Sequence, residues 1–297
     1  MLTDVREHLG RTLFDRVAGP DGPAIRARIH GTPGPRWFGP ERPIRAVHGD
    51  ASMFIGGISA LLLQSLHPLA MAAVAAHSGY RGDPWGRLQR TSTFLAVTTF
   101  GTAEDAQRAV DQVRGIHERI RGRTAEGLAY HAADPHLLGW VHAAQTESFL
   151  RAHQRYGARP LDAAGYDGYV ADTARVAEAL GVLDPPLDLR GLSERLAAYR
   201  PELRATAQAR AAARFVLLRP PLPLAARPFY GGLAANAVAL LPPWARAMLR
   251  LPRLPVVEDI AVRPAGHVLT RTIRWAMAPP PPPADRPRRA AGRSSGP

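Results

Sequence analysis

The chain has 297 residues, of which 46% are hydrophobic, and its formal net charge is +13 at pH 7. This length can bury a large core and suggests one large domain or two modest ones. The chain contains neither Cys nor Lys. Their absence excludes a thiolate nucleophile, an iron–sulfur cluster, thiolate-ligated or CxxCH-attached haem, a Schiff-base lysine and a Walker-type phosphate lysine. Any metal or cofactor must therefore be held by His, Asp, Glu, Tyr or Met.

The positive charge does not indicate a nucleic-acid partner. Every basic side chain is Arg, and the arginines are scattered among Ala, Pro and Gly without a helical stripe or interleaved aromatic residues. The N-terminal segment is polar and amphipathic and lacks the basic region and apolar run of a signal peptide. We therefore expect no nucleic-acid binding and a cytoplasmic localisation.

The first half of the chain is organised around one apolar block. Residues 1–18 are typical of a short helix, and Gly19–Arg45 is rich in Pro and Gly, as expected for an extended arm. Gly49–His77 is the longest apolar block, but its polar residues and Pro68 make it a poor bilayer span. We predict a buried helical hairpin here, in which His67 ends the first helix and is either a structural hydrogen-bonding residue or a ligand.

The next helix has clear start signals. Asp83 and Pro84 provide an N-cap and a proline at the first helical position, which predicts a helix through about Phe100. Arg87 and Thr91 are four residues apart and therefore share a face of this helix.

A histidine lies on the apolar stripe of the helix after Thr102. Residues at spacings of four, three, four and three form this stripe: Ala106, Val110, Val113, His117 and Ile120. His117 is therefore expected to face the core, where it is either a hydrogen-bonded core histidine or a metal ligand.

A second inward histidine is expected on a helix that begins at Asp134 and runs to about Arg155, after a loop over Arg123–Ala133. His142 shares a face of this helix with Leu138, Gln145 and Phe149. Two inward histidines could ligate one metal together, or one could ligate while the other works beside it. Their spacing is neither HExxH nor the Glu-xx-His of di-iron bundles.

The remainder of the chain also reads as helical. We predict helices over 161–180, 192–199 and 201–217, and after Arg219 short apolar pieces that either cover the core or rest on a membrane surface. Residues 279–297 are proline-rich and basic and are expected to be disordered. The fold class is therefore all-α: one large helical bundle domain over 46–278, with Pro-rich irregular segments at both ends (1–45 and 279–297).

Several motifs together carry a family resemblance: GGISALLLQSLHPLAMAAVAAHS, RGDPWGRLQRTSTFLAVTTFG, VRGIHERIRG and DPHLLGWVHAAQTESFLRAHQRYG. In order and spacing they resemble the MpaB/rubber-oxygenase (latex clearing protein) family, also known as DUF2236. The resemblance covers most of residues 45–250. It implies a mostly helical fold, a b-type haem held by a histidine, and oxidative cleavage of carbon–carbon double bonds in isoprenoid chains by dioxygen.

Residue by residue, the resemblance places the family's Arg-xxx-Thr pair on Arg87 and Thr91 and the axial histidine on His117. It leaves His142 to line the pocket or act as a second axial ligand, and we include His67 among the cofactor-binding candidates. Rubber-cleaving relatives have a lysine where this chain has Arg90, which is too basic to ligate iron.

The resulting hypothesis is a haem b-dependent oxygenase acting with dioxygen on a hydrophobic, isoprenoid-like substrate, with weak membrane-surface association left open. In the rubber enzymes an acidic residue is proposed to act as a base. Met71 occupies its approximate position in this chain, so rubber itself is not the expected substrate. The alternative is a non-catalytic protein of the same fold that binds haem or lacks it.

Overall fold

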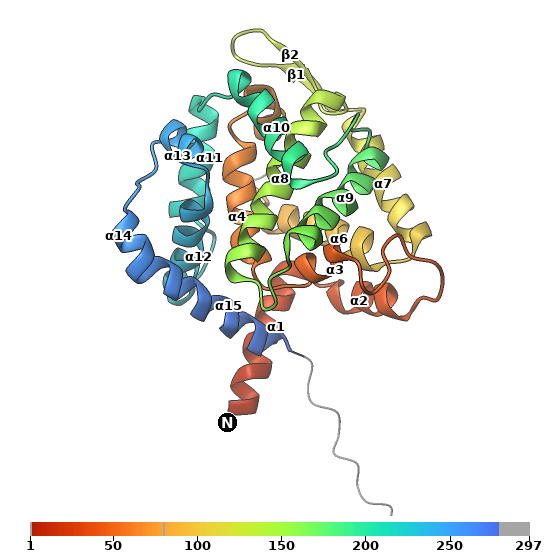
Figure 1. Ribbon diagram of the computed structural model, residues 1–297, viewed down its shortest axis with the longest axis vertical. Coiled ribbons are helices and arrows are strands. Elements are labelled where there is room, and N and C mark those ends of the chain that lie inside the picture. Colours follow the sequence, from red (N-terminus) through yellow and green to blue (C-terminus); the bar gives the residue numbers. More distant parts are fainter. Residues whose placement is uncertain (1, 80, 279–297) are drawn as a thin grey trace, which may run out of the picture.

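The computed structural model of the chain describes residues 2–79 and 81–278. Within this part the architecture is all-α, as the sequence predicts, and the helices pack as one bundle (Figure 1). The predicted disordered tail, 279–297, lies outside the described residues.

The helices in chain order are α1 (Leu2–Ala18), α2 (Gly22–Gly31), α3 (Pro43–His48), α4 (Met53–Gln64), α5 (Pro68–His77), α6 (Pro84–Phe100), α7 (Ala103–His117), α8 (Pro135–Tyr156), α9 (Ala163–Leu180), α10 (Leu189–Tyr199), α11 (Ala207–Leu218), α12 (Arg227–Leu240), α13 (Pro243–Leu249), α14 (Pro255–Val257) and α15 (Arg263–Met277). Short turns of other helix types are η1 (Arg200–Glu202), η2 (Leu224–Ala226) and η3 (Glu258–Val262). The strands β1 (Arg121–Arg123) and β2 (Ala129–His131) form an antiparallel hairpin.

The centre of the bundle is the pair α4–α8, with α12 packed on another side of α4. Small residues make the close approach of this pair possible: a Cβ at Gly56 would lie 2.9 Å from Cδ1 of Phe149 and 3.1 Å from Cβ of Ala152. The indole nitrogen of Trp140 donates to the carbonyl of Gln64 at 3.0 Å, which satisfies a backbone group at the end of α4.

Helix boundaries follow the capping signals read from the sequence. The side chains of Asp83, Thr102 and Asp134 accept hydrogen bonds from backbone amides in the first turns of α6, α7 and α8. Gly181, at φ +104°, ends α9 in the left-handed conformation that a side chain would strain.

Three expectations are wrong in part. The segment expected as an extended arm contains α2, which packs on α6. The expected loop over 123–133 contains most of a β-hairpin, too short to show strand alternation. The predicted break at Pro68 is present, but α4 and α5 bend by 110° there, so they form a corner rather than a hairpin whose arms run side by side.

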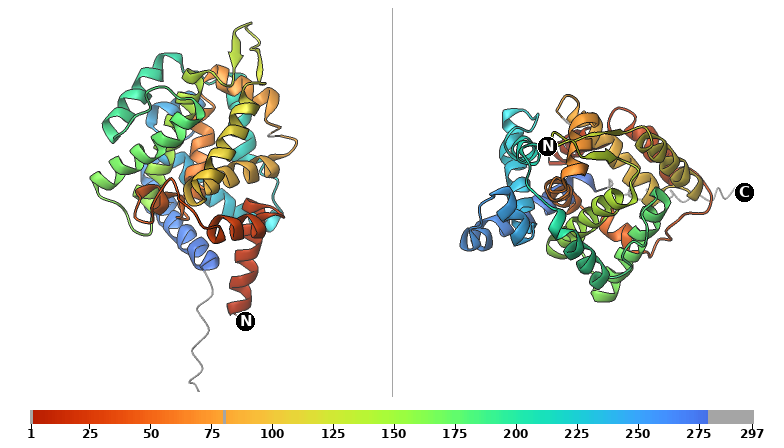
Figure 2. Two further views of the ribbon diagram at one scale, coloured as in Figure 1. Left: turned by 90° about the vertical axis from the view of Figure 1, so that its right-hand side faces the viewer. Right: turned by 90° about the horizontal axis from the view of Figure 1, so that it is seen from above.

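The C-terminal region is more regular than expected. Instead of short apolar pieces, it contains the long helices α12 and α15. Leu233 and Ala237 of α12 are buried against the main core, so α12 covers the core. Helix α15 lies beside α1 (Figures 1 and 2). No single described helix is long and apolar enough to cross a membrane, although the bent pair α4–α5 meets the criterion by length and composition.

Candidate functional site

One face of the central helix α4 is not covered by protein. Leu61 is 41% exposed although it lies in the middle of the bundle's core helix. Gly57, one turn earlier, has nothing within 4 Å of the position of an added Cβ. Phe54 and Gln64 continue the same stripe and are half-buried. A central helix with an uncovered apolar stripe indicates space inside the bundle.

Helices α6 and α7 do not cover this stripe. Helix α6 packs on α1, α2, α3 and α7, and α7 packs on α6 and α9; within the described residues neither packs closely against α4 or α8. Figure 2 (left) views the molecule from the side of α7. Side chains on three of these helices are accordingly only half-buried, namely Phe94, Val97, Val113, His117, Val141, His142 and Gln145. The histidines of the α7 and α8 stripes therefore both belong to incompletely covered faces.

His117 ends α7 and is half-buried. Its Nδ1 is buried without a hydrogen-bond partner. Burial lowers the pKa of His117, and the nearby carboxylate of Glu118 only partly opposes this effect. The imidazole is therefore neutral near pH 7, which is the form that ligates a metal.

His142 has the same character. Burial, assisted by the positive charge of Arg195, lowers the pKa of His142 to about 4. Its Nε2 is buried without a hydrogen-bond partner. A buried nitrogen without a hydrogen-bond partner costs about 1–3 kcal/mol. In each of these two histidines, that nitrogen could bind a ligand.

The predicted pair on α6 is less enclosed. Thr91 is exposed, and its hydroxyl donates to the carbonyl of Arg87 at 3.0 Å. Arg87 is half-buried, while Arg90 lies outward with Nη1 at 3.3 Å from Oδ2 of Asp83. The functional roles of Arg87 and Thr91 stay predictions.

The buried carboxylate of Asp50, just before α4, is bound by the C-terminal helix α15. Its Oδ1 and Oδ2 accept from Arg274 at 2.8 and 2.9 Å. The backbone amides of Ser52 and Ala158 also donate to it. Sequence reasoning did not find Arg274, because this contact joins residues 224 positions apart.

His67 lies at the α4–α5 corner in a separate group of side chains. His67, His136 on α8 and Glu202 in η1 each offer one possible metal-ligand atom, and these three atoms lie within 4.8 Å of one another. Sequence reasoning missed His136 and Glu202, because no local pattern links residues 66 positions apart.

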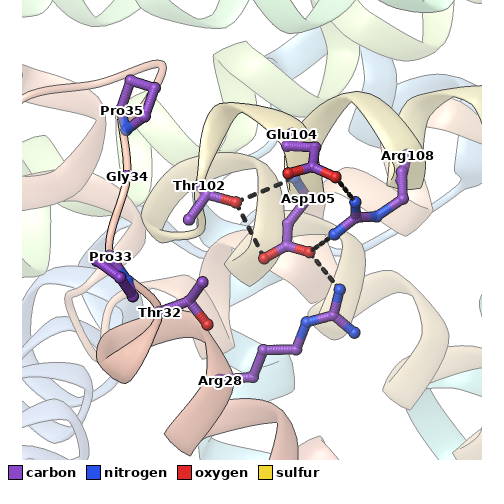
Figure 3. Close-up of a pocket in the computed structure, with 9 residues that line it drawn as sticks. All are labelled: Arg28, Thr32, Pro33, Gly34, Pro35, Thr102, Glu104, Asp105 and Arg108. Atoms are coloured by element: carbon purple, nitrogen blue, oxygen red, sulfur yellow. Dashed lines mark hydrogen bonds and ion pairs between the residues drawn. The ribbon is translucent and has the colours of Figure 1, made fainter.

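Two surface hollows lie outside this interior. One of about 220 Å³ is formed where the loop after α2 meets the start of α7 (Figure 3). Its buried carboxylate, Asp105, accepts from Thr102 and pairs with Arg28 and Arg108, so the charges there are already neutralised within the protein. The other, of about 600 Å³, is open and lies on the β-hairpin, with Arg121, Arg123 and His131 in its lining.

Together, the fold and the interior define a helical domain with an incompletely covered apolar core and neutral histidines on its walls. The chain belongs to the family described as "ER-bound oxygenase mpaB/B'/Rubber oxygenase, catalytic domain", which matches residues 45–275. This match confirms the resemblance carried by the sequence motifs and shows that the domain is of an oxygenase family.

Two mycobacterial proteins are also similar: uncharacterized protein Mb2261 of Mycobacterium bovis and uncharacterized protein Rv2237 of Mycobacterium tuberculosis. Each is 34% identical over 100 residues, which is 33% of this chain and 38% of the relative. The similarity therefore spans well under two thirds of those proteins. No solved structure matches the chain.

Proposed function

We propose that this chain is a haem b-dependent oxygenase that acts with dioxygen on a hydrophobic, isoprenoid-like substrate. The observation that carries the proposal is the combination of oxygenase-family membership with two neutral, unpartnered histidines on half-covered helices. A flat apolar cofactor needs open space beside small residues, and Gly57 and the exposed Leu61 supply such a surface. These features support a b-type haem as the cofactor.

In this proposal His117 is the axial ligand, because it ends the inward stripe of α7 and matches the family's histidine position. Burial keeps its ring neutral, so no proton has to be displaced before ligation. His142, also neutral, lines the pocket or acts as a second axial ligand.

Arg87 and Thr91 would act from α6. The guanidinium of Arg87 would bind a haem propionate, an anion that Arg recognises well. Arg87→Met should then weaken haem binding. Haem supplies the binding and activation of dioxygen when bound. The protein contributes ligation, an apolar lining that excludes water, and access for a hydrophobic substrate.

Haem binding by purified protein, expressed with adequate haem supply, tests the assignment. We expect one haem per chain with a Soret band, lost in His117→Ala but retained in the control His30→Ala, which alters an exposed histidine on α2. If His117→Ala keeps an unaltered Soret band while His142→Ala loses it, the axial ligand is His142.

The alternative is a non-catalytic protein of this fold that binds haem or lacks it. Rubber-cleaving relatives have a lysine at the position of Arg90. Here Arg90 is exposed and pairs with Asp83, which favours this alternative. Substrate-dependent dioxygen consumption by the haem-loaded protein distinguishes the two functions. Cytoplasmic localisation and weak membrane-surface association stay predictions.

A further inference from the structure

Three side chains from distant parts of the sequence converge at the α4–α5 corner. Nε2 of His136 lies 2.8 and 3.0 Å from the two carboxylate oxygens of Glu202. Nε2 of His67 lies 3.4 Å from Oε2 of the same carboxylate. We propose that His67, His136 and Glu202 form a binding site for a divalent transition metal, with Zn²⁺ as the best match, separate from the proposed haem site.

The strongest argument is the state of His67. The residue is only 2% exposed, and neither of its ring nitrogens has a hydrogen-bond partner; the 3.4 Å approach to Glu202 lacks hydrogen-bond geometry. Buried polar atoms in proteins are almost always partnered, and exceptions require an explanation. A metal ion shared by Nε2 of His67 and the Glu202 carboxylate accounts for Nε2, whose 3.4 Å approach to that carboxylate is an ion pair without a hydrogen bond.

The distances suit a small metal ion. Bonds of roughly 2.0–2.2 Å in tetrahedral geometry place neighbouring ligand atoms roughly 3.3–3.6 Å apart. The separations of 2.8–3.4 Å between the Glu202 carboxylate and the two imidazoles are close to this value. The three ligand atoms lie within 4.8 Å of one another, and the side chains of His136 and Glu202 are 53% and 44% exposed, so they can adjust around an ion.

The surrounding structure holds the backbone around these three residues in place. Tyr199 donates from its hydroxyl to the carbonyl of His136 at 2.7 Å, and its ring packs on the His136 ring at 4.7 Å. The backbone amide of Arg204, two residues after Glu202, donates to the carbonyl of Leu66, next to His67, at 2.8 Å. Ligands held by such supporting contacts lose less freedom on binding a metal.

The donor set indicates the class of metal. Two imidazole nitrogens and one carboxylate oxygen suit Zn²⁺ and other late first-row divalent ions rather than Mg²⁺ or Ca²⁺, which prefer oxygen ligands. Three protein ligands at a solvent-facing position leave a fourth coordination position open to water. The site would thus connect the α4–α5 corner, the start of α8 and η1 through one ion.

Zinc binding by the full chain, followed by elemental analysis and titration calorimetry, tests the proposal. We expect one Zn²⁺ per chain and a higher melting temperature with zinc. Glu202→Gln and His136→Asn should each weaken binding at least tenfold. The matched control Glu194→Gln, which alters an exposed glutamate paired with Arg190 on α10, should bind zinc as the parent does.

Haem content, measured on the same samples, separates this site from the proposed haem site. Glu202→Gln should lose zinc and keep its haem, and His117→Ala should keep its zinc. Circular dichroism shows whether each variant is folded. A parent protein that binds no zinc beyond the level of Glu202→Gln, or a folded Glu202→Gln variant that binds it equally well, overturns the proposal.

Discussion

The ion pair between Asp50 and Arg274 is expected to be one of the strongest single contributors to stability. The side chains are 7% and 24% exposed, and two hydrogen bonds of 2.8 and 2.9 Å join them. Arg274 also donates to the carbonyl of Tyr156, so it links α15 to the end of α8 and to the turn before α4. Replacing Arg274 with Met leaves the Asp50 carboxylate buried with only the amides of Ser52 and Ala158 as donors.

Removing one partner of a buried pair costs about 3–5 kcal/mol. Because water reaches part of Arg274, we expect the lower end, about 3 kcal/mol, in the free energy of unfolding of Arg274→Met measured with urea on haem-free protein. The control Arg263→Met, at the start of the same helix α15, removes an exposed ion pair with Asp259. It should lower the free energy of unfolding by less than about 1 kcal/mol.

The pH dependence provides a second measurement. Burial by itself would raise the pKa of Asp50, but hydrogen bonds from Arg274, Ser52 and Ala158 outweigh burial and hold the pKa below its ordinary value. A carboxyl group with a lowered folded-state pKa stabilises the protein above its unfolded pKa, about 3.9, and this contribution is lost as pH falls through the folded pKa. The difference between parent and Arg274→Met should therefore be greatest at neutral pH and shrink below about pH 4.

The double variant Asp50→Asn with Arg274→Met should be more stable than Arg274→Met alone, because it no longer buries an unpaired charge. A loss below about 1 kcal/mol in Arg274→Met, or no recovery in the double variant, would refute the reasoning.

Two further predictions concern packing and protonation. Gly56→Ala should lower the free energy of unfolding by about 1–3 kcal/mol, because the added Cβ collides with Phe149. Gly57→Ala places its Cβ in open space, so it should be neutral or stabilise the haem-free chain by up to about 1 kcal/mol. Urea unfolding compares the two variants, and equal losses would contradict the open stripe on α4. Burial lowers the pKa of His48 to about 3 and, with Arg195, that of His142 to about 4, so both stay neutral in the folded protein but take up a proton on unfolding below pH 6.5. The free energy of unfolding should therefore fall as the pH is lowered from 6.5 to 4, by up to about 1.4 kcal/mol per pH unit for each of these histidines. Stability measured against pH should show a slope smaller by up to this amount in His48→Gln, and an unchanged slope would contradict the reasoning.

The sequence alone determined the class of the fold and the starts of the capped helices α6, α7 and α8. Caps such as Asp83, Thr102 and Asp134 act within one turn, and the apolar stripe of α7 is a repeat along one helix, so both are readable from neighbouring residues. Motif order likewise predicted the oxygenase family that the match over residues 45–275 confirms. The β-hairpin escaped detection because its strands have three residues each, too few for alternation to be visible.

Only the tertiary structure decided which side chains meet. The pairing of Asp50 with Arg274 and the grouping of His67 with His136 and Glu202 depend on how α15, α8 and η1 pack against the ends of α4, and no local pattern encodes those distances. The same holds for the uncovered stripe at Gly57 and Leu61. Hydrophobic periodicity predicts that such residues are buried, but whether a neighbouring helix covers them depends on the packing of the whole bundle.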